Sequence, residues 1–234
     1  MKKYKSLIFD CDGVILNSNQ IKTDAFRKVF RKYNKNAVDE FINYHRNNGG
    51  ISRYIKIEKF LKNILPKYVE NKEFNKNEFR MLLRSYSNQC KASLLKCEVT
   101  KELSNLRKVS GNIPWLIVSG GDQFELREVF NKRNLASFFN GGIFGSPEKK
   151  IDIIKREICN GIIKFPALML GDSKLDHIAA KSNNIDFLFV YKWTDFNSFN
   201  DYCFCNSIKT IESGLICNFS AILFMLSTFE FQCT

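Results

Sequence analysis

Residues 6–14 read Ser6-Leu7-Ile8-Phe9-Asp10-Cys11-Asp12-Gly13-Val14, a mainly apolar run that ends in two carboxylates and a glycine. The run predicts a strand that is buried on both faces of a sheet. Because side chains in an extended chain alternate in direction, Asp10 and Asp12 lie on the same side. Open α/β sheets bind their ligands at the carboxyl ends of the strands. This stretch therefore predicts an α/β fold with a pair of acids at its ligand-binding edge.

Further apolar runs follow, and helical patterns alternate with most of them. The runs cover residues 115–118, 143–144, 167–170 and 185–190. One helix is expected over residues 122–133, where Asp122 and Glu125 form a capping-box arrangement. A second begins with Ser146 as N-cap and Pro147 as first helical residue, and a third follows residues 172–173. Strand and helix in alternation predict a parallel sheet with helices on both faces.

Residues 17–96 break this alternation, because helical patterns recur there without a convincing buried strand. The apolar positions of these patterns are Phe26, Val29, Phe30 and Tyr33, then Tyr54, Ile57, Leu61 and Leu65, then Phe79, Leu82, Leu83 and Tyr86. A chain of 234 residues is long enough for a core domain that carries a smaller inserted one. We therefore expect a core domain of residues 1–16 and 97–234 and an inserted helical domain of residues 17–96.

Two more acids follow a later predicted strand. Asp172 and Asp176 are four residues apart at the start of a helix and so lie on one helical face. With Asp10 and Asp12 they can converge on one crevice, where bare carboxylates would repel one another. A small set of oxygen ligands suits Mg²⁺, so the four acids predict a magnesium site. With Ser173 as N-cap, Asp176 also fits a capping box, and it can serve the helix, the metal site or both.

A third strand end offers donors for an anion. Ser119 and Gly120 come between a predicted strand and the next helix, so a hydroxyl and backbone N–H groups can cradle an anion there, although Ser119 can also be a simple turn residue. Lys149 and Lys150 follow the next strand, and either can bring a cation to the same crevice. These are the parts of a phosphoryl-transfer site: a carboxylate nucleophile, a second carboxylate for proton transfer, a metal and donors for the transferring oxygens.

The order of these motifs resembles that of the haloacid dehalogenase superfamily of phosphohydrolases. The parts are Asp-x-Asp-Gly-Val at residues 10–14, a strand-end Ser119, a lysine after residue 146 and Gly-Asp-x-x-x-Asp at residues 171–176. Together they extend over nearly the whole chain. The helical insertion after the first motif further resembles members with an α-helical C1 cap, such as phosphoglycolate phosphatase and β-phosphoglucomutase. The resemblance implies a Rossmann-like core with an inserted helical cap domain.

The resemblance also implies roles for the acids. Asp10 would attack phosphorus and form an aspartyl phosphate, while Asp12 would protonate the leaving alcohol and then activate water. Mg²⁺ would be held by Asp10, the backbone carbonyl of Asp12 and Asp172. Asp176 would act from behind these ligands, on metal-bound water or on the lysine.

The remaining motif residues would bind the phosphoryl group. Ser119 and the Gly120 N–H would bind its oxygens. The resemblance favours Lys150 over Lys149 as the cation that neutralises both the nucleophile and the phosphate.

The insertion contains a loop of residues 45–53 with two glycines and two arginines. Such a loop can be a flexible connection with solvated arginines. Alternatively, it descends over the crevice, and its arginines bind a second anionic group of the substrate, because Arg suits bidentate recognition of carboxylate or phosphate. On that interpretation the candidate specificity residues are Arg46, Asn48, Gly49 and Arg53.

These residues predict a Mg²⁺-dependent phosphomonoesterase that acts on a small anionic phosphorylated metabolite, for example a sugar phosphate. Asp12 disfavours a dehalogenase, because a halide leaving group needs no proton. One alternative is a phosphomutase of the β-phosphoglucomutase type. Such mutases carry a His where this chain has Lys22, which weakens that alternative.

A second alternative is a non-catalytic basic protein that binds nucleic acid on the same fold. The chain has 36 Lys and Arg against 24 Asp and Glu, a net charge of +12, which favours an anionic partner. The lysines are dispersed, however, and no basic run is interleaved with aromatic residues, so a solvated surface explains them better. We therefore expect a small-molecule phosphate ester, and no nucleic acid, as the partner.

Cysteine usage and the apolar C-terminal region bear on location. The 8 cysteines include no CxxC pair and no Cys/His cluster at zinc-ligand spacing, which favours a reduced, cytoplasmic chain. Residues 219–231 are strongly apolar but fall short of the ~20 residues of a spanning helix, so we expect a buried C-terminal element and no membrane contact. His45 and His177 have no partner at catalytic spacing and are expected to be ordinary polar residues. The oligomeric state stays open at this stage.

Overall fold

The structure, a computed structural model, describes residues 4–101 and 103–212. Six parallel strands form the sheet of this described part, in the order β3-β2-β1-β4-β5-β6. The strands are β1 (Ser6–Phe9), β2 (Trp115–Asp122), β3 (Gly142–Ser146), β4 (Ala167–Gly171), β5 (Asp186–Val190) and β6 (Lys209–Ile211). The order runs outward from β1 in both directions, so the switch point lies between β1 and β4, where an open α/β sheet leaves a crevice.

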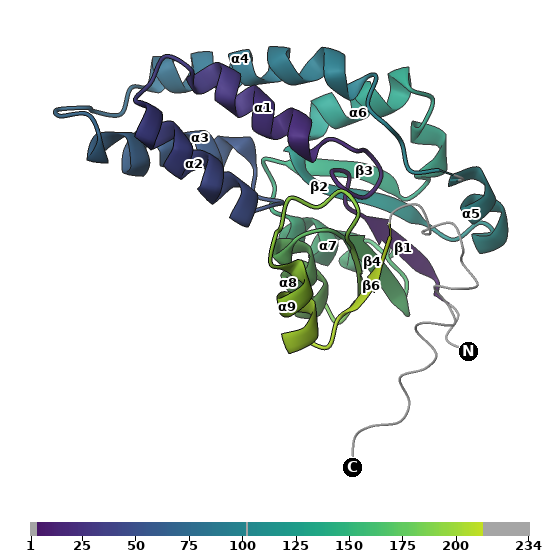
Figure 1. The fold of residues 1–234 in the computed structure, drawn as a ribbon. Helices are drawn as coiled ribbons and strands as arrows, with labels where there is room; N and C mark the ends of the chain where they lie inside the picture. Colours follow the sequence, from purple (N-terminus) through teal and green to yellow (C-terminus); the bar gives the residue numbers. More distant parts are fainter. Residues whose placement is uncertain (1–3, 102, 213–234) are drawn as a thin grey trace.

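Helices cover both faces of the sheet (Figure 1). On one face, α7 (Lys150–Cys159) and α8 (Lys174–Ser182) share a buried apolar cluster with Ile8 and Met169. The cluster on the other face contains Leu7 and Phe9, together with residues of α5 (Leu103–Ser110) and α6 (Gln123–Lys132). Successive residues of β1 thus enter opposite clusters, as expected for a strand buried on both sides. The α/β fold with a Rossmann-like parallel sheet is confirmed.

The helical insertion, which we define as residues 17–96, connects β1 to β2. Its helices are α1 (Asn19–Phe30), α2 (Lys35–Asn47), α3 (Arg53–Lys59) and α4 (Lys76–Leu94), and α3 continues through the π-helix Phe60–Ile64 and the short 3-10 helix Leu65–Lys67. In Figure 1 these helices lie beyond the carboxyl ends of the central strands. They pack around a buried aromatic cluster of Phe26, Phe30, Phe41, Phe60 and Tyr86.

The start of α7 differs from the sequence prediction. Ser146 is the last residue of β3 rather than an N-cap, and the helix begins at Lys150 with Lys149 as N-cap. The reason is that Ser146 still pairs with Asp122 of β2, and its hydroxyl donates a hydrogen bond to the carbonyl of Gly121 at 3.1 Å. These contacts keep the chain extended past the position where the helix was expected.

Several elements have no counterpart in the prediction. They are α2, α5, α9 (Phe199–Cys205) and β6. The apolar stretch of residues 219–231, expected to form a buried element, lies outside the described residues. Within the described residues, no helix combines the length and the apolar character needed to cross a membrane.

The aromatic cluster makes a test of the insertion's stability. Phe30 is fully buried, and its ring centroid is 4.0 Å from that of Phe60. Replacing it by alanine leaves a cavity, so Phe30→Ala should lower the free energy of unfolding by about 3–5 kcal/mol. Phe124 is 79% exposed, and Phe124→Ala should change it by about 0.5 kcal/mol or less. Urea unfolding of both variants checks this, and equal losses would contradict it.

Candidate active site

The acids that follow β1 and β4 meet at the carboxyl edge of the sheet. The two strands pair with Phe9 opposite Leu170, so Asp10 lies beside the turn that contains Asp172. Ligand oxygens of Asp10, Asp172 and Asp176 all lie within 4.8 Å of one another. These three side chains are buried. The structure therefore gathers three of the four predicted acids into one cluster.

A single lysine joins this cluster. Lys150 Nζ lies 2.9 Å from Asp10 Oδ1 and also forms an ion pair with Asp176 Oδ1. Lys150 is buried at the first turn of α7, whereas Lys149 is exposed. Burial lowers the pKa of Lys150, but the Asp10 and Asp176 carboxylates outweigh it and raise that pKa above its usual value. Of the two candidate lysines, Lys150 is the one that lies in the crevice, and it stays charged.

Asp176 has two duties in the structure. Its Oδ2 accepts hydrogen bonds from the Ser173 backbone N–H at 3.1 Å and the Ser173 hydroxyl at 2.6 Å, which completes a capping box at the start of α8. Its Oδ1 faces Lys150. The carboxylate thus fixes the helix start and positions the lysine at the same time.

The acidic cluster contains more negative than positive charge. Burial raises the pKa of Asp10 to about 7, with Lys150 lowering it and Asp176 and Asp12 raising it. Burial, together with the Asp10 and Asp176 carboxylates, raises the pKa of Asp172 well above its usual value. One ammonium faces three buried carboxylates here. A buried, all-oxygen donor set of this kind suits a small divalent cation such as Mg²⁺.

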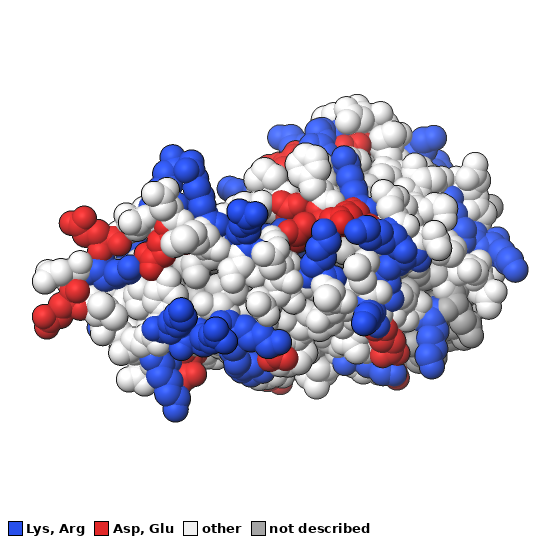
Figure 2. All heavy atoms as spheres, turned by 90° about the horizontal axis from the view of Figure 1, so that it is seen from above, with Lys and Arg blue, Asp and Glu red and all other residues white. Residues whose placement is uncertain are grey.

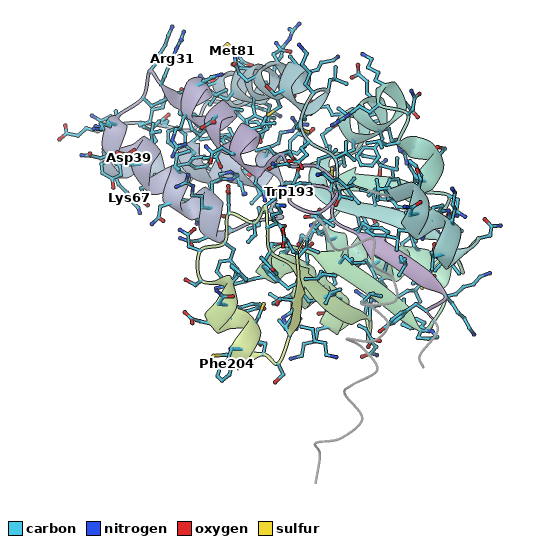
Figure 3. All side chains as sticks on the ribbon, turned by 45° about the vertical axis from the view of Figure 1, so that its right-hand side comes forward. Arg31, Asp39, Lys67, Met81, Trp193 and Phe204 are labelled. Carbon is cyan, nitrogen blue, oxygen red and sulfur yellow. The ribbon has the colours of Figure 1, made fainter. Side chains whose placement is uncertain are left out.

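Asp172 is held by a close approach of the first motif. Gly13 has φ +75°, and a Cβ at this position would come within 2.1 Å of Asp172 Oδ2, so no other residue fits without displacing the carboxylate. Asn19 donates through Nδ2 to Asp172 Oδ2 at 2.7 Å and to the carbonyl of Trp193 at 2.8 Å. Trp193 is labelled in Figure 3, where it lies between the insertion and the sheet.

The second motif acid is bound to the insertion. Asp12 accepts a hydrogen bond from the Ser18 hydroxyl at 2.5 Å and forms an ion pair with Lys22 of α1. Burial raises the pKa of Asp12, but Lys22 and Ser18 outweigh it and lower that pKa below its usual value. The ion pair was not foreseen. A signal was present, because Asn19 and Lys22 continue the helical stripe of Phe26 toward the end of α1 that faces the site.

The Gly-rich loop of the insertion rests on the end of β2, which carries Ser119 and Gly120. Ser119 is fully buried, and its hydroxyl accepts a hydrogen bond from the Gly121 N–H at 3.0 Å. A Cβ on Gly120 would lie 2.0 Å from the Gly50 carbonyl oxygen, and one on Gly49 would lie 3.1 Å from Ser173 Cβ. The loop therefore lies over the crevice, and residue 120 must be glycine for the backbones to approach so closely. The binding of a substrate anion by the loop's arginines stays a prediction.

A cavity lies between the insertion and the edge of the sheet. Its wall includes Asp12, Gly120 and Asp172 from the core and Lys22, Arg46, Gly49 and Arg53 from the insertion. Asn48, the remaining predicted specificity residue, is not part of this wall. Its Nδ2 donates to the carbonyl of Tyr44 at 2.8 Å at the end of α2, and this contact keeps the side chain away from the cavity.

Arg53 lines the cavity, but its guanidinium already forms an ion pair with a carboxylate of the protein. Its Nη2 lies 2.7 Å from Glu125 Oε2 and 3.8 Å from Asp122 Oδ2, and the Tyr54 hydroxyl donates to the same Asp122 oxygen at 2.6 Å. The capping box predicted for α6 is therefore only half formed. Asp122 caps the Glu125 N–H at 3.0 Å, but the Glu125 carboxylate binds Arg53 instead of returning to the helix start.

The two histidines differ in their surroundings. His45 is buried and lines the cavity, with its ring nitrogens 3.1 Å from Thr23 Oγ1 and 2.8 Å from Lys56 Nζ. The prediction of an ordinary polar residue is wrong for His45, because three helices that are separate in sequence bring these partners together. His177 lies 2.7 Å from the Tyr202 hydroxyl and is not part of the cavity wall.

Residues 7–190 match the model of the haloacid dehalogenase-like hydrolase family. The match extends over all the motif residues described above and most of the chain. The chain therefore belongs to this family of hydrolases and is an enzyme. No curated protein sequence matches it significantly.

Solved structures share the fold. A haloacid dehalogenase-like hydrolase from Streptococcus pneumoniae aligns over 98% of this chain and 100% of its own, with a TM-score of 0.64 and 18% identity. A protein described as a predicted phosphoglycolate phosphatase, from Haemophilus somnus, aligns over 94% and 99%, with a TM-score of 0.70 and 16% identity. A β-phosphoglucomutase-like protein from Bacteroides vulgatus aligns over 95% and 90%, with a TM-score of 0.69 and 16% identity. At these identities the likeness establishes the fold.

The charge imbalance of the acidic cluster predicts opposite effects of one substitution. Asp172→Asn removes a buried negative charge, so without metal it should raise the melting temperature by about 2–4 °C for each kcal/mol of relieved repulsion. Mg²⁺ should raise the melting temperature of the wild type, because it binds only the folded state, and should raise that of the variant much less. Thermal unfolding with and without Mg²⁺ checks both effects. An equal Mg²⁺ response of the two proteins would contradict the site.

Proposed function

We propose that this hydrolase is a Mg²⁺-dependent phosphomonoesterase that acts on a small anionic phosphate ester through an aspartyl-phosphate intermediate. The observation that carries the proposal is the contact of Lys150 with both Asp10 and Asp176, with Asp172 in the same cluster. A buried carboxylate beside a fixed ammonium and a divalent-cation site is an arrangement suited to phosphoryl transfer. The phosphatase description of a structural neighbour agrees with this proposal.

Asp10 is the proposed nucleophile. Its Oδ1 is held by the Cys11 N–H at 2.7 Å and by Lys150 at 2.9 Å, which leaves Oδ2 to attack phosphorus. The new bond joins Oδ2 to phosphorus as the bond from phosphorus to the alcohol oxygen breaks. Asp10, Asp172 and the carbonyl of Asp12 would hold Mg²⁺, which stabilises negative charge on the phosphoryl oxygens when bound. Ser119, the Gly120 N–H and Lys150 would bind the remaining oxygens.

Asp12 and Lys22 together are the proposed general acid and general base. The departing alkoxide needs a proton, and we assign this proton to the pair because the Lys22 ammonium contacts the Asp12 carboxylate. Water then attacks phosphorus and releases Asp10, and the Asp12 carboxylate accepts the proton of that water. Ser18 and Lys22 hold both oxygens of Asp12, so its orientation is fixed before the substrate binds.

The helical insertion, residues 17–96, is proposed to be a cap domain on a core of residues 1–16 and 97–234. The approach of Gly50 to Gly120 and the ion pair of Arg53 with Glu125 support a cap that covers the crevice. A covered crevice excludes bulk water from the aspartyl phosphate and strengthens the electrostatic contacts around it.

A small-molecule substrate fits this enclosed cavity better than a polymer. Figure 2 shows the Lys and Arg side chains spread over one face of the molecule with Asp and Glu side chains among them, which is unlike the continuous basic stripe of a nucleic-acid surface. We also expect the enzyme in the cytoplasm. The six cysteines among the described residues are free thiols, as in proteins of reducing compartments.

The nucleophile provides the direct test. Asp10→Asn should lower the release of phosphate from p-nitrophenyl phosphate in the presence of Mg²⁺ by at least about 1,000-fold, because the amide cannot attack phosphorus. Asp24→Asn is the matched control, since Asp24 binds Arg27 on the surface of α1 and should keep the wild-type rate. Equal rates for wild type and Asp10→Asn would end the proposal.

A phosphomutase is the second candidate, and the β-phosphoglucomutase-like neighbour with a TM-score of 0.69 favours it. Lys22 argues against it, because its ammonium is engaged with Asp12. A phosphatase should convert hexose 1-phosphates to free sugar and phosphate, with no isomeric hexose 6-phosphate. Phosphorus NMR of the reaction distinguishes these products. Isomer formation without phosphate release would favour the mutase.

A further inference from the structure

Lys56 is a buried cation in the cavity wall that the proposed mechanism does not use. It lies on α3 and is 3% exposed. The same cavity is lined by Asp12 and Asp172, so Lys56 shares one enclosed space with the residues proposed to act on the phosphate. The proposed reaction leaves a function for this ammonium open.

The hydrogen bonds of Lys56 leave one N–H group free. Its Nζ lies 2.8 Å from His45 Nδ1 and 3.3 Å from the His45 carbonyl oxygen. The Thr23 hydroxyl donates to Asp195 and therefore accepts from His45 Nε2–H, so Nδ1 is the acceptor for Lys56. An ammonium has three N–H donors. Two of them bind His45, and the third has no acceptor among residues 4–101 and 103–212.

Lys56 also differs from the neighbouring cations in charge balance. Lys22 is paired with Asp12, and Arg53 with Glu125. No carboxylate in the described part of the chain forms an ion pair with Lys56. Burial, with the Lys22 charge next in effect, outweighs the Asp12 and Asp195 carboxylates, which raise the pKa of Lys56, and lowers that pKa to about 7. A buried ammonium that contacts no carboxylate is unfavourable unless a ligand brings a negative charge into contact with it.

We propose that Lys56 is a specificity-determining residue that binds a second anionic group, a carboxylate or a phosphate, on the alcohol part of the substrate. This inference rests on the proposed function and names the substrate class: a phosphate ester whose leaving group is itself an anion. The free N–H of Lys56 and its missing counter-ion are both satisfied by one such group.

The other cations of the cavity are less suited to this contact. Arg53 would have to break its ion pair at 2.7 Å with Glu125 to reach a substrate, and Lys22 would have to leave Asp12. Arg46 lies at the partly exposed rim of the cavity, where water screens its charge. Lys56 alone among these four combines burial with an unmatched charge.

Binding of inert phosphonates tests the inference without catalysis. The reference probe is propylphosphonate, which has no second anionic group. It is compared with 3-phosphonopropionate and 4-phosphonobutyrate, which carry a carboxylate at two distances, and with ethane-1,2-diphosphonate, which carries a second phosphonate. In the presence of Mg²⁺, isothermal titration of the wild type should show at least one doubly anionic probe binding about tenfold or more tightly than propylphosphonate, as expected for a charged hydrogen bond. The probe that binds most tightly identifies the second anionic group as a carboxylate or a phosphate.

Variants of Lys56 locate the source of this preference. Lys56→Met should reduce it to about twofold or less, and Lys56→Arg, which keeps the charge, should retain part of it. Lys59→Met is the matched control on the same helix, because Lys59 contacts the Tyr44 ring and does not line the cavity. It should keep the wild-type preference.

The outcomes separate this inference from the proposed function. If the wild type shows no preference for any doubly anionic probe, or if Lys56→Met keeps the preference, the inference is wrong even though Asp10-dependent phosphatase activity persists. If Lys56→Met fails to fold, Lys56→Gln, which removes the charge but keeps a hydrogen-bond donor, takes its place with the same expected loss of preference. Loss of the Asp10 dependence would instead overturn the reaction and leave the phosphonate result standing as a property of the cavity.

Discussion

The contact of Lys150 with two of three buried carboxylates is the interaction on which the rest of the site depends. It joins the end of β1 to the first turns of α7 and α8 through one ammonium. Lys150 offsets part of the repulsion among three buried acids that lie within 4.8 Å of one another, and it lowers the pKa of Asp10 against the effect of burial. Asp176 shows how closely fold and chemistry are connected here, since one of its oxygens begins a helix while the other holds the lysine. Any substitution that shifts the start of α8 therefore also shifts the cation beside Asp10.

A second constraint is the fit between the helical insertion and the sheet. The Gly50 carbonyl lies against Gly120, where a methyl group would have no room, and Arg53 reaches across to Glu125 of α6. The insertion also supplies side chains to the motif acids, because Asn19 binds Asp172 and Lys22 binds Asp12. The insertion is thus part of the electrostatic environment of the acids, in addition to covering them.

The sequence predicts the parts of this protein that depend on local patterns. Asp10 and Asp12 could be placed because a buried strand must end at the ligand-binding edge, and the helix cap at Ser173 could be placed because a capping box has a fixed spacing. The start of α7 could not, because β2 holds Ser146 in the sheet through a contact that no local signal encodes. Glu125 fits a local capping pattern but is taken by Arg53, more than seventy residues earlier in the chain. The surroundings of His45 were missed for the same reason, since its partners Thr23 and Lys56 come from two other helices.

The charges that line the cavity bear on the class of substrate as well as on the class of reaction. Around the acidic cluster, negative charge exceeds positive charge, which suits a metal and a phosphoryl group bound together. Toward α3, Lys22 is paired with Asp12, whereas Lys56 forms no ion pair, although the Asp12 and Asp195 carboxylates act on it from a distance. A phosphate ester with a neutral leaving group would bind at the acidic cluster but would leave the desolvated Lys56 ammonium without an anion in contact. A leaving group with its own negative charge would place an anion beside Lys56 as well, and it would reverse the fall in the pKa of Lys56 that burial causes.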